Sequence, residues 1–447
     1  MVHSLFSLFS SAFLSPKGKM ICLLFFLLGS DLKSQIQSGP MLGYNTMREV
    51  LVWVQTEKAQ SVKMIYFPEN NTAQKDSFLL QSEREKAFTA KLIASGLDEG
   101  TTYIYQVFLG NETQPSATGT FTTQALWQHR RDPPEFQFAI GSCAYINEEA
   151  YDRPGTPYGK GTEIFQSILA KKPEMMLWLG DNLYLREGDW SSRSGIHHRY
   201  THFKSHPDLQ ELWKSMHHYA IWDDHDYGPN DADRSFIAKE LTLEAFQNFW
   251  GNYEYGINGK AGITSMYSYN DLDFFLLDNR YDRSPNKRNS GKREILGKEQ
   301  IQWLIDALTY SKASFKIVAI GGQFLNPAAV YENHATYAEE RQEMIDLIEK
   351  ENLKNVVFLS GDRHKTELTK MKLKNGNLIY DYTCSPLSSK AYNSSDEENE
   401  LRVKGTHVST QNFGLLSLSG SFKNRKLLLQ NFDAEGKLQW EYEIKKE

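Results

Sequence analysis

The sequence predicts a small all-β sandwich followed by a larger α/β domain. Between residues 38 and 124, β-rich runs are separated by turn residues. From residue 136 onward, apolar strand-like runs alternate with amphipathic helical segments, which is typical of sheets covered on both faces by helices. A chain of 447 residues is too long for one ordinary domain. Aromatic residues make up 13% of the chain, a proportion that favours strand-rich structure.

Residues 1–34 predict a signal peptide. The apolar run 20–29 follows Lys17 and Lys19 and is too short to cross a bilayer. Its removal takes away three lysines and one aspartate, which changes the formal net charge from −6 to −8. No later apolar stretch is long enough to span a membrane. We therefore expect an exported protein, whether periplasmic, cell-surface or secreted, with no transmembrane segment after signal removal.

Residues 38–124 predict the sandwich, with strands expected at Val50–Val54, Val62–Phe67, Tyr103–Phe108 and Thr118–Thr122. The stretch Leu97–Tyr105 resembles the tyrosine-corner region of fibronectin type III domains, where a tyrosine hydroxyl bonds back to upstream backbone. This segment carries no acid–base cluster, so we expect it to be structural or to orient substrate. Residues 125–135 predict a linker, because the pair Pro133–Pro134 fits neither a helix nor a central strand.

Residues 136–447 predict the α/β domain. Strands are expected at Phe136–Ile140, Met175–Leu179, Tyr219–Trp222, Phe274–Leu277, Ile317–Ile320 and Val356–Leu359. Helices are expected at Glu163–Lys171, Glu299–Leu308 and Ala338–Glu349. The tail from Leu378 is strand-rich, with turns at Asn375–Gly376 and Glu435–Gly436, and predicts antiparallel closing strands.

Potential metal ligands follow five of these apolar runs. Since open α/β sheets bind ligands outside the carboxyl ends of their strands, the five runs predict one polar crevice. The runs are Gly141–Cys143, Gly180–Tyr184, Trp222–Asp226, Leu277–Arg280 and Ser360–His364.

Each run also has a simpler structural explanation. An isolated Asp181 would most often cap a helix, and an isolated Cys143 would most often be a buried apolar side chain. The run Asp223–Asp226 is more specific, because it places three carboxylates beside a histidine, and the carboxylates repel one another unless cations or hydrogen bonds neutralise them. Cys384 is not part of a polar motif and is expected to be structural. After signal removal only these two cysteines remain, too few for a disulfide framework.

Together and in this order, the motifs resemble the PhoD-like alkaline phosphatase family over roughly residues 40–445. They are Gly-Ser-Cys143, Gly-Asp181-x-x-Tyr184, Trp222-Asp-Asp-His-Asp226, Leu-Asp278-x-Arg280-Tyr281 and Ser-Gly-Asp362-Arg-His364. The resemblance implies an αββα metallophosphoesterase-like domain with mixed sheets. It also implies an exported alkaline phosphatase or phosphodiesterase, a hydrolase of small phosphate esters, which we expect to be a monomer.

The resemblance also implies a metal site. Cys143 and Tyr184 would bind iron(III), with Asp181 bridging to a second position occupied by calcium or another divalent metal. The other implied metal ligands are Asp224, Asn230 and Asp362 at the second position and His364 at either. Asn230 lies in Tyr-Gly-Pro-Asn-Asp, where the family usually has a Val-Glu-Asn-type run.

Two further residues would act on the substrate. A metal-activated hydroxide or oxygen would attack phosphorus in line. His225 would protonate the leaving alkoxide or hydrogen-bond the phosphoryl oxygens, and Arg280 would clamp those oxygens.

Two alternatives remain. A purple-acid-phosphatase-like hydrolase would also suit Gly-Asp181-x-x-Tyr184, but it would carry Gly-Asn-His and Gly-His-x-His motifs. A non-catalytic exported adhesion or binding protein would use the carboxylates as structural calcium sites. The net charge of −6 argues against a nucleic-acid scaffold. The sequence leaves open whether phosphomonoesters, phosphodiesters or phospholipid head groups are preferred.

Overall fold

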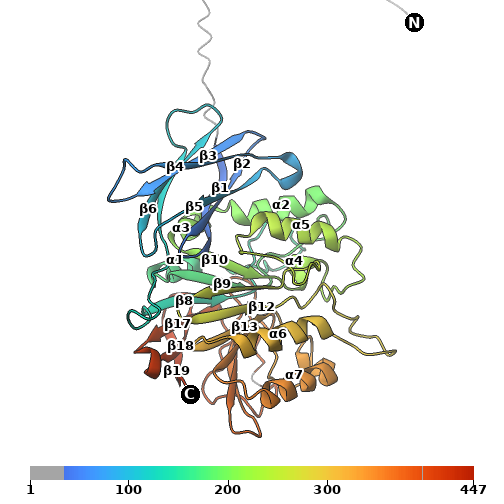
Figure 1. The fold of residues 1–447 in the computed structure, drawn as a ribbon. Coiled ribbons are helices and arrows are strands. Elements are labelled where there is room, and N and C mark those ends of the chain that lie inside the picture. The colour runs from blue at the N-terminus through green and yellow to red at the C-terminus, as the bar shows by residue number, and fades with distance from the viewer. Residues whose placement is uncertain (1–34, 395) are drawn as a thin grey trace, which may run out of the picture. The chain divides into compact units, whose positions relative to one another are not determined.

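The computed structural model describes residues 35–394 and 396–447, which belong to one compact unit (Figure 1). The predicted signal peptide, residues 1–34, lies outside the described residues. Within the described ranges, no helix is both long and apolar enough to cross a membrane.

The N-terminal part is a two-layer β-sandwich, as the sequence predicts. One layer has the strand order β4-β3-β6-β7, and the other is formed by β1, β2 and β5. Alternate side chains such as Val52, Met64 and Val107 are buried between the layers. The strands are β1 (Ile36–Asn45), β2 (Glu49–Thr56), β3 (Ser61–Pro68), β4 (Asp76–Gln81), β5 (Thr89–Ser95), β6 (Thr102–Leu109) and β7 (Ala117–Thr122), with a 3-10 turn η1 (Arg84–Lys86).

The predicted tyrosine corner is present at the start of β6. The Tyr103 hydroxyl accepts a hydrogen bond from the backbone N–H of Asp98 at 2.9 Å. This bond ties the loop before β6 to the strand, and it is the interaction that the Leu97–Tyr105 stretch predicts.

The sandwich is not separate from the rest of the chain. Strand β1 pairs with β2 on one side and, in parallel, with β10 (His217–Ile221) on the other. The layer β1-β2-β5 therefore continues a nine-stranded sheet with the order β19-β18-β17-β8-β9-β10-β1-β2-β5. The sequence did not predict this continuity.

The α/β part is built on that sheet and a second, six-stranded sheet of order β11-β12-β13-β14-β16-β15. The two sheets face each other, and aromatic pairs such as Phe138–Phe274 and Tyr219–Tyr267 pack between them. The remaining strands are β8 (Phe136–Gly141), β9 (Met175–Leu179), β11 (Ser265–Tyr269), β12 (Leu272–Leu276), β13 (Phe315–Ile320), β14 (Val356–Ser360), β15 (Glu367–Lys372), β16 (Leu378–Thr383), β17 (Asn412–Ser419), β18 (Lys426–Asp433) and β19 (Leu438–Lys445).

Helices cover the outer faces of both sheets (Figure 1). Trp178 of β9 packs against Trp213 and Trp250 on the helical side of the nine-stranded sheet. Leu304 and Ile345 belong to the apolar cluster on the outer face of the other sheet. The helices are α1 (Glu163–Ala170), α2 (Arg193–Lys204), α3 (Pro207–Ser215), α4 (Asp224–Tyr227), α5 (Lys239–Phe249), α6 (Lys298–Tyr310) and α7 (Ala338–Lys350), with 3-10 turns η2 (His334–Tyr337) and η3 (Phe422–Asn424).

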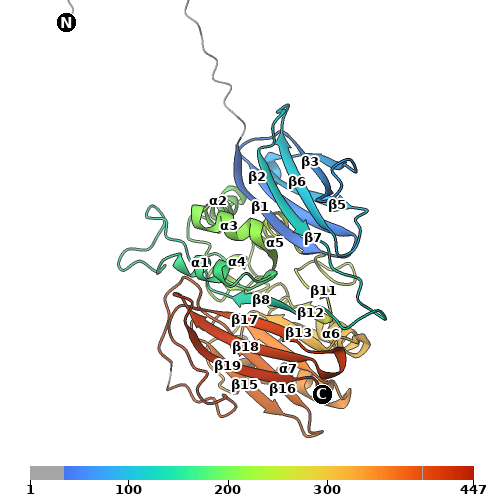
Figure 2. The same cartoon turned by 90° about the vertical axis from the view of Figure 1, so that its left-hand side faces the viewer.

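This helix–sheet–sheet–helix order confirms the predicted αββα class with mixed sheets. The three predicted helices correspond to α1, α6 and α7. The predicted closing strands are also present, since β17, β18 and β19 form antiparallel pairs and lie side by side in Figure 2. Strands β8, β9 and β10 run parallel, as do β12, β13 and β14, so their carboxyl ends meet along one edge.

Candidate metal centre

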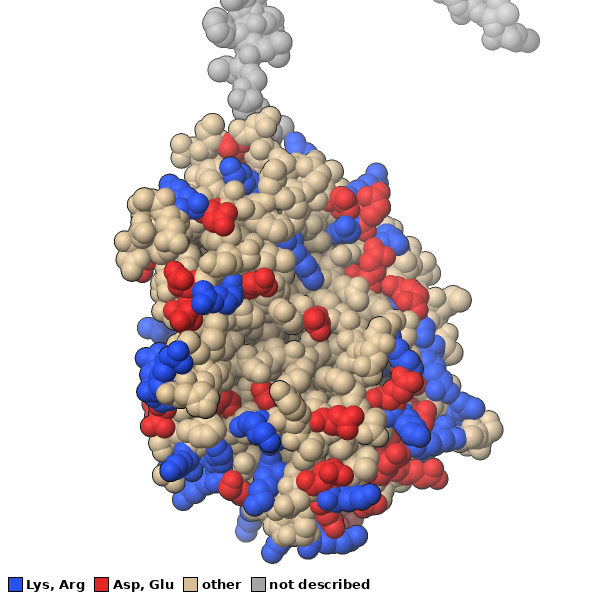
Figure 3. All heavy atoms as spheres, viewed as in Figure 1, with Lys and Arg blue, Asp and Glu red and all other residues tan. Residues whose placement is uncertain are grey.

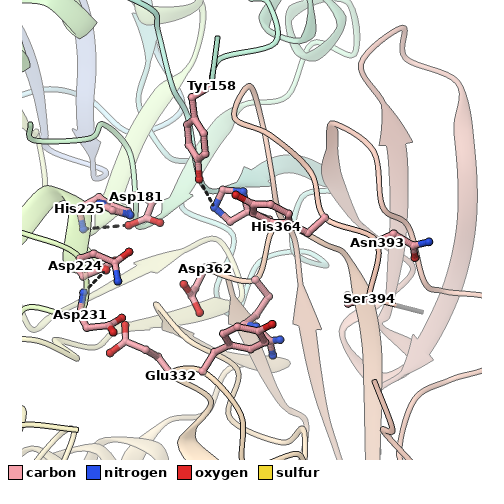
Figure 4. Close-up of a pocket in the computed structure, with 14 residues that line it drawn as sticks. Tyr158, Asp181, Asp224, His225, Asp231, Glu332, Asp362, His364, Asn393 and Ser394 are labelled. Atoms are coloured by element: carbon pink, nitrogen blue, oxygen red, sulfur yellow. Dashed lines mark hydrogen bonds between the residues drawn. The ribbon is translucent and has the colours of Figure 1, made fainter. Parts of the chain in front are cut away.

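The predicted ligand runs converge where these strands end. Cys143 follows β8, Asp181 follows β9, Asp224 follows β10, and Asp362 and His364 follow β14. A cavity of about 560 Å³ opens at this place (Figure 4). It is lined by Tyr158, Asp181, Asp224, His225, Asn230, Asp231, Tyr331, Glu332, Asp362, Arg363, His364, Tyr392, Asn393 and Ser394.

The backbone at the strand ends is unusual. Cys143, Asp181, Asp362 and His364 all have φ between 49° and 67°, a left-handed conformation that non-glycine residues seldom adopt. Neighbouring chain segments hold them there. A Cβ on Gly361, for example, would lie 2.6 Å from Ser142 Cβ, so the turn after β14 fits against the turn after β8 only with glycine. Such strain is concentrated at functional sites.

A thiol, a carboxylate, a phenol and an imidazole meet at the inner end of the cavity. The Cys143 thiol donates to Asp181 Oδ2 at 3.5 Å, and the Tyr184 hydroxyl donates to the same oxygen at 3.3 Å. The Tyr184 hydroxyl also lies 3.2 Å from His364 Nε2. Cys143, Asp181 and His364 are buried and have ligand atoms within 4.8 Å of one another. These donors can hold one cation.

Two further groups of potential ligands extend from Asp181. Asp181, Asp224 and His225 form one, and Asp223, Asp224 and Glu332 form the other, each with ligand atoms within 4.8 Å. Because neighbouring groups share a carboxylate, the site offers adjacent cation positions. Figure 4 shows the carboxylates of Asp181, Asp224 and Asp362 directed toward the same open space.

Several buried atoms of these groups lack hydrogen-bond partners. They are Asp223 Oδ2, Asp224 Oδ1 and His225 Nδ1. Buried polar atoms are nearly always paired, so unpaired buried atoms within groups of potential ligands are what a bound cation would satisfy. The residues therefore fit a metal site.

The pKa shifts of the potential ligands also fit a metal site. Burial, together with neighbouring carboxylates, raises the pKa of Asp181 and of Asp362 well above the usual range for a carboxyl. Burial also raises the pKa of the Cys143 thiol and of the Tyr184 phenol. Burial therefore disfavours the charged forms of these four groups, whereas bound cations would favour them.

The sequence of this chain matches known protein families. The model of the PhoD-like phosphatase family matches residues 138–424. The chain belongs to the PhoD-like phosphatase family. Residues 33–126 match a second family model, described only as a domain of unknown function. Alkaline phosphatase D of Bacillus subtilis (strain 168) is 24% identical over 327 residues, covering 62% of this chain. The chain spans about half of that relative's length, 53%.

Two solved structures share the fold. The structure of PhoD superposes with a TM-score of 0.73 at 17% identity and covers 92% of each chain. A purple acid phosphatase from yellow lupin (Lupinus luteus) seeds superposes with a TM-score of 0.65 at 12% identity, covering 91% of this chain and 74% of the other. The fold is thus common to both enzyme types, and the family match separates them in favour of the PhoD-like one.

The PhoD-like motif residues occupy distinct places around the cavity. Asn230 is exposed on the loop after α4 and lines the cavity. The His225 ring lies 4.1 Å from the Tyr184 ring, centroid to centroid. The imidazole of His364 is oriented by its Nδ1, which contacts the Lys390 carbonyl oxygen and the Ser389 hydroxyl. Its Nε2 therefore faces the site, as in histidine metal ligands held by a second partner.

Arg280 is the exception, and its predicted role as a phosphate clamp does not agree with the structure. Its side chain is fully buried and is absent from the cavity lining. The guanidinium donates instead to the carboxylates of Asp223 and Glu332. Three nearby acidic side chains, with Asp224 at 3.8 Å, attract the guanidinium into the protein and leave it no face toward a substrate.

The sequence analysis missed Glu332, Tyr158 and Arg363. Glu332 and Tyr158 lie in loops, away from the strand ends that the five motif runs follow. Arg363 lies between two predicted ligands, Asp362 and His364, and this position in the sequence already indicated a place near the cavity. It is the arginine that lines the cavity.

Proposed function

We propose that this protein is an exported, metal-dependent phosphoesterase of the alkaline phosphatase or phosphodiesterase type. The observation that carries the proposal is the convergence of Cys143, Asp181, Tyr184 and His364 beside an acidic group with unpaired buried oxygens, at one end of a cavity. Membership of the PhoD-like phosphatase family supports the same reaction class. Export is supported by the signal-like residues 1–34.

The donor types support a mixed metal centre. The Cys143 thiolate sulfur and the Tyr184 phenolate oxygen would suit iron(III). Asp181 would lie between the iron position and the second cation position. Carboxylates from Asp224 and Asp362, with Asn230, suit calcium or another hard divalent cation. When bound, such cations lower the pKa of water and neutralise the charge of a phosphate ester.

The chain's own residues would bind and orient the ester. Burial lowers the pKa of His225 to about 4, so the ring is neutral near pH 7. A neutral imidazole on the cavity wall can donate its N–H to a phosphoryl oxygen or to the leaving oxygen. Arg280 would act indirectly, because it pairs with the Asp223 carboxylate and holds it in place.

The reaction is tested by assaying p-nitrophenyl phosphate and bis(p-nitrophenyl) phosphate with the metal-loaded protein, before and after chelation. We expect hydrolysis that chelation abolishes and added iron and calcium restore. Asp181→Asn should lower kcat/KM about 100-fold or more, since even partners behind metal ligands cost up to that factor. Asp306→Asn, on the exposed face of α6, should have no effect. Metal binding and thermal stabilisation without turnover of either ester would favour the non-catalytic alternative.

A further inference from the structure

The cavity has two chemically different ends. The inner end carries the carboxylates and imidazoles of the candidate metal centre. The outer end carries the residues Tyr331 and Tyr392, which are 79% and 44% exposed, together with Arg363. A volume of about 560 Å³ lies within the ~300–1,000 Å³ typical of pockets for drug-sized ligands. This is far more room than a phosphoryl group needs, so the outer end is available to the rest of an ester.

The backbone around Tyr331 is constrained although the residue is largely exposed. Its backbone has φ of 49°, which is rare for an aromatic residue. The two following residues anchor it: Glu332 pairs with Arg280 and Arg283, and Asn333 Oδ1 accepts from Arg363 at 2.6 Å. An exposed tyrosine is ordinary in itself. A tyrosine at the mouth of a cavity has a constrained position when the next residue in the chain forms buried ion pairs.

Arg363 supports the ring from behind. The guanidinium carbon lies 4.8 Å from the Tyr331 ring centroid. The same guanidinium is fixed by Glu397 at 2.6 Å and by Gln323 Oε1 at 2.7 Å. Because Arg363 occupies one side of the ring and the ring remains largely exposed, the other face is open for stacking.

Tyr392 continues the aromatic wall inward. Its backbone N–H donates to the His364 carbonyl oxygen at 3.0 Å, and its ring lies 5.2 Å from the His364 ring. An ester bound with phosphorus at the metal centre would pass Tyr392 before its leaving group reached Tyr331. Flat aromatic surfaces at this place suit a planar heterocycle, because every nucleobase has a face that stacks on aromatic rings.

We propose that Tyr331, supported by Arg363 and flanked by Tyr392, forms a subsite that stacks the base of a nucleoside phosphate, which makes nucleoside phosphate esters the preferred substrate class. This inference rests on the proposed phosphoesterase function. The inner site would take the phosphoryl group, and the aromatic subsite would take the base of the leaving nucleoside.

The test compares adenosine 5′-monophosphate with ribose 5-phosphate on the metal-loaded protein. The two esters share the same primary alkoxide leaving group and differ at the base. We expect wild type to favour the nucleotide in kcat/KM by roughly tenfold or more. Tyr331→Ala should bring this ratio close to one, because it lowers kcat/KM for the nucleotide far more than for ribose 5-phosphate. Tyr331→Phe should keep the ratio, and so should Tyr310→Ala, a tyrosine 82% exposed at the end of α6.

The outcomes separate the subsite from the reaction. Equal kcat/KM for both esters in wild type, or a ratio unaltered by Tyr331→Ala, would overturn the subsite and leave the phosphoesterase proposal standing. If neither ester is hydrolysed, the proposed function is in question, and calorimetric titration with adenosine then decides about the subsite. Adenosine binding that Tyr331→Ala weakens supports it, and no adenosine binding refutes it.

Discussion

Arg280 illustrates how a residue in a catalytic motif can act through its neighbours. Its guanidinium, fully buried, pairs with Asp223 and Glu332 and lies 3.8 Å from Asp224 Oδ1. It therefore compensates part of the negative charge behind the candidate metal centre. Asp224 and Glu332 also line the cavity, so the position of the Arg280 guanidinium affects how these two acidic side chains are placed.

Arg280→Gln should therefore destabilise the fold. Removal of one partner leaves buried carboxylates uncompensated, which typically costs about 3–5 kcal/mol. We expect a large decrease in the urea midpoint of the metal-free protein, and a smaller one for Arg280→Lys, which keeps the charge without the planar fork. Unchanged stability of Arg280→Gln combined with a raised KM would instead return Arg280 to the role of a substrate clamp.

Lys204 offers a pH-dependent test on the opposite side of the sheet. Its ammonium lies 3.3 Å from the Trp250 ring centroid and 3.2 Å from Met41 Sδ, with no exposed surface. Burial holds the pKa of Lys204 well below its ordinary value of 10.5. Between the two pKa values the unfolded chain binds one more proton than the folded chain, so this residue makes stability rise with pH.

Lys204→Met should remove that dependence. We expect it to raise thermal stability at pH 7 by about 1–4 kcal/mol, as apolar replacements of buried charged groups can do. The gain should shrink as the pH approaches 10.5, where the unfolded lysine also loses its proton. Differential scanning calorimetry at pH 7 and pH 10 measures the change. A loss of stability at both pH values would show instead that the tryptophan rings hold a charged ammonium.

At the scale of elements, the joint between the sandwich and the large sheet depends on two glycines in contact. A Cβ on Gly251, which follows α5, would lie 2.6 Å from Gly43 Cα in β1. The Tyr44 N–H donates to the Gly251 carbonyl oxygen at 2.7 Å across the same contact. On the other side of the joint, His217 Nδ1 lies 2.8 Å from the Gly43 carbonyl oxygen.

Gly251→Ala should push these two segments apart. Overpacking of this kind costs about 1–3 kcal/mol, so we expect a lower unfolding temperature. Gly188→Ala is the matched control, because its nearest neighbour atom would lie at an ordinary 3.8 Å. Thermal unfolding followed by circular dichroism compares the two. Equal effects of both substitutions would contradict a tight glycine contact at the joint.

The same scale shows what the sequence could predict. Apolar periodicity located α1, α6 and α7, whose buried residues are mainly apolar, with Gln300 of α6 and Glu340 of α7 as the polar exceptions. It could not locate α2, because that helix buries Arg199 and Lys204 alongside its apolar residues. The motif runs at strand ends located Cys143 and Asp181, whose positions follow from β8 and β9.

Residues whose role depends on a distant partner could not be predicted. Glu332 reaches the site through its pairing with Arg280, 52 positions away in the chain. The same pairing explains why Arg280 was misassigned: its motif position indicates the crevice, but only the fold reveals the carboxylates that surround it.

At the scale of the whole molecule, an acidic chain has to accommodate an anionic substrate. The formal net charge is −6, and Figure 3 shows acidic and basic side chains interspersed on the face drawn. The concentration of carboxylates around the cavity would repel a phosphate ester unless cations were bound there. The metal centre thus connects the fold, the charge distribution and the proposed reaction, and its existence is the central claim.

Metal analysis of the purified protein with its visible spectrum, alongside Cys143→Ser and Cys384→Ser, tests that claim most directly. Both cysteines are buried and free, but only Cys143 belongs to the ligand cluster. We predict tightly held iron and a charge-transfer band that Cys143→Ser shifts or abolishes and Cys384→Ser preserves. Iron-free wild-type protein, with metal content and hydrolysis unaltered by Cys143→Ser, would contradict the thiolate–phenolate centre.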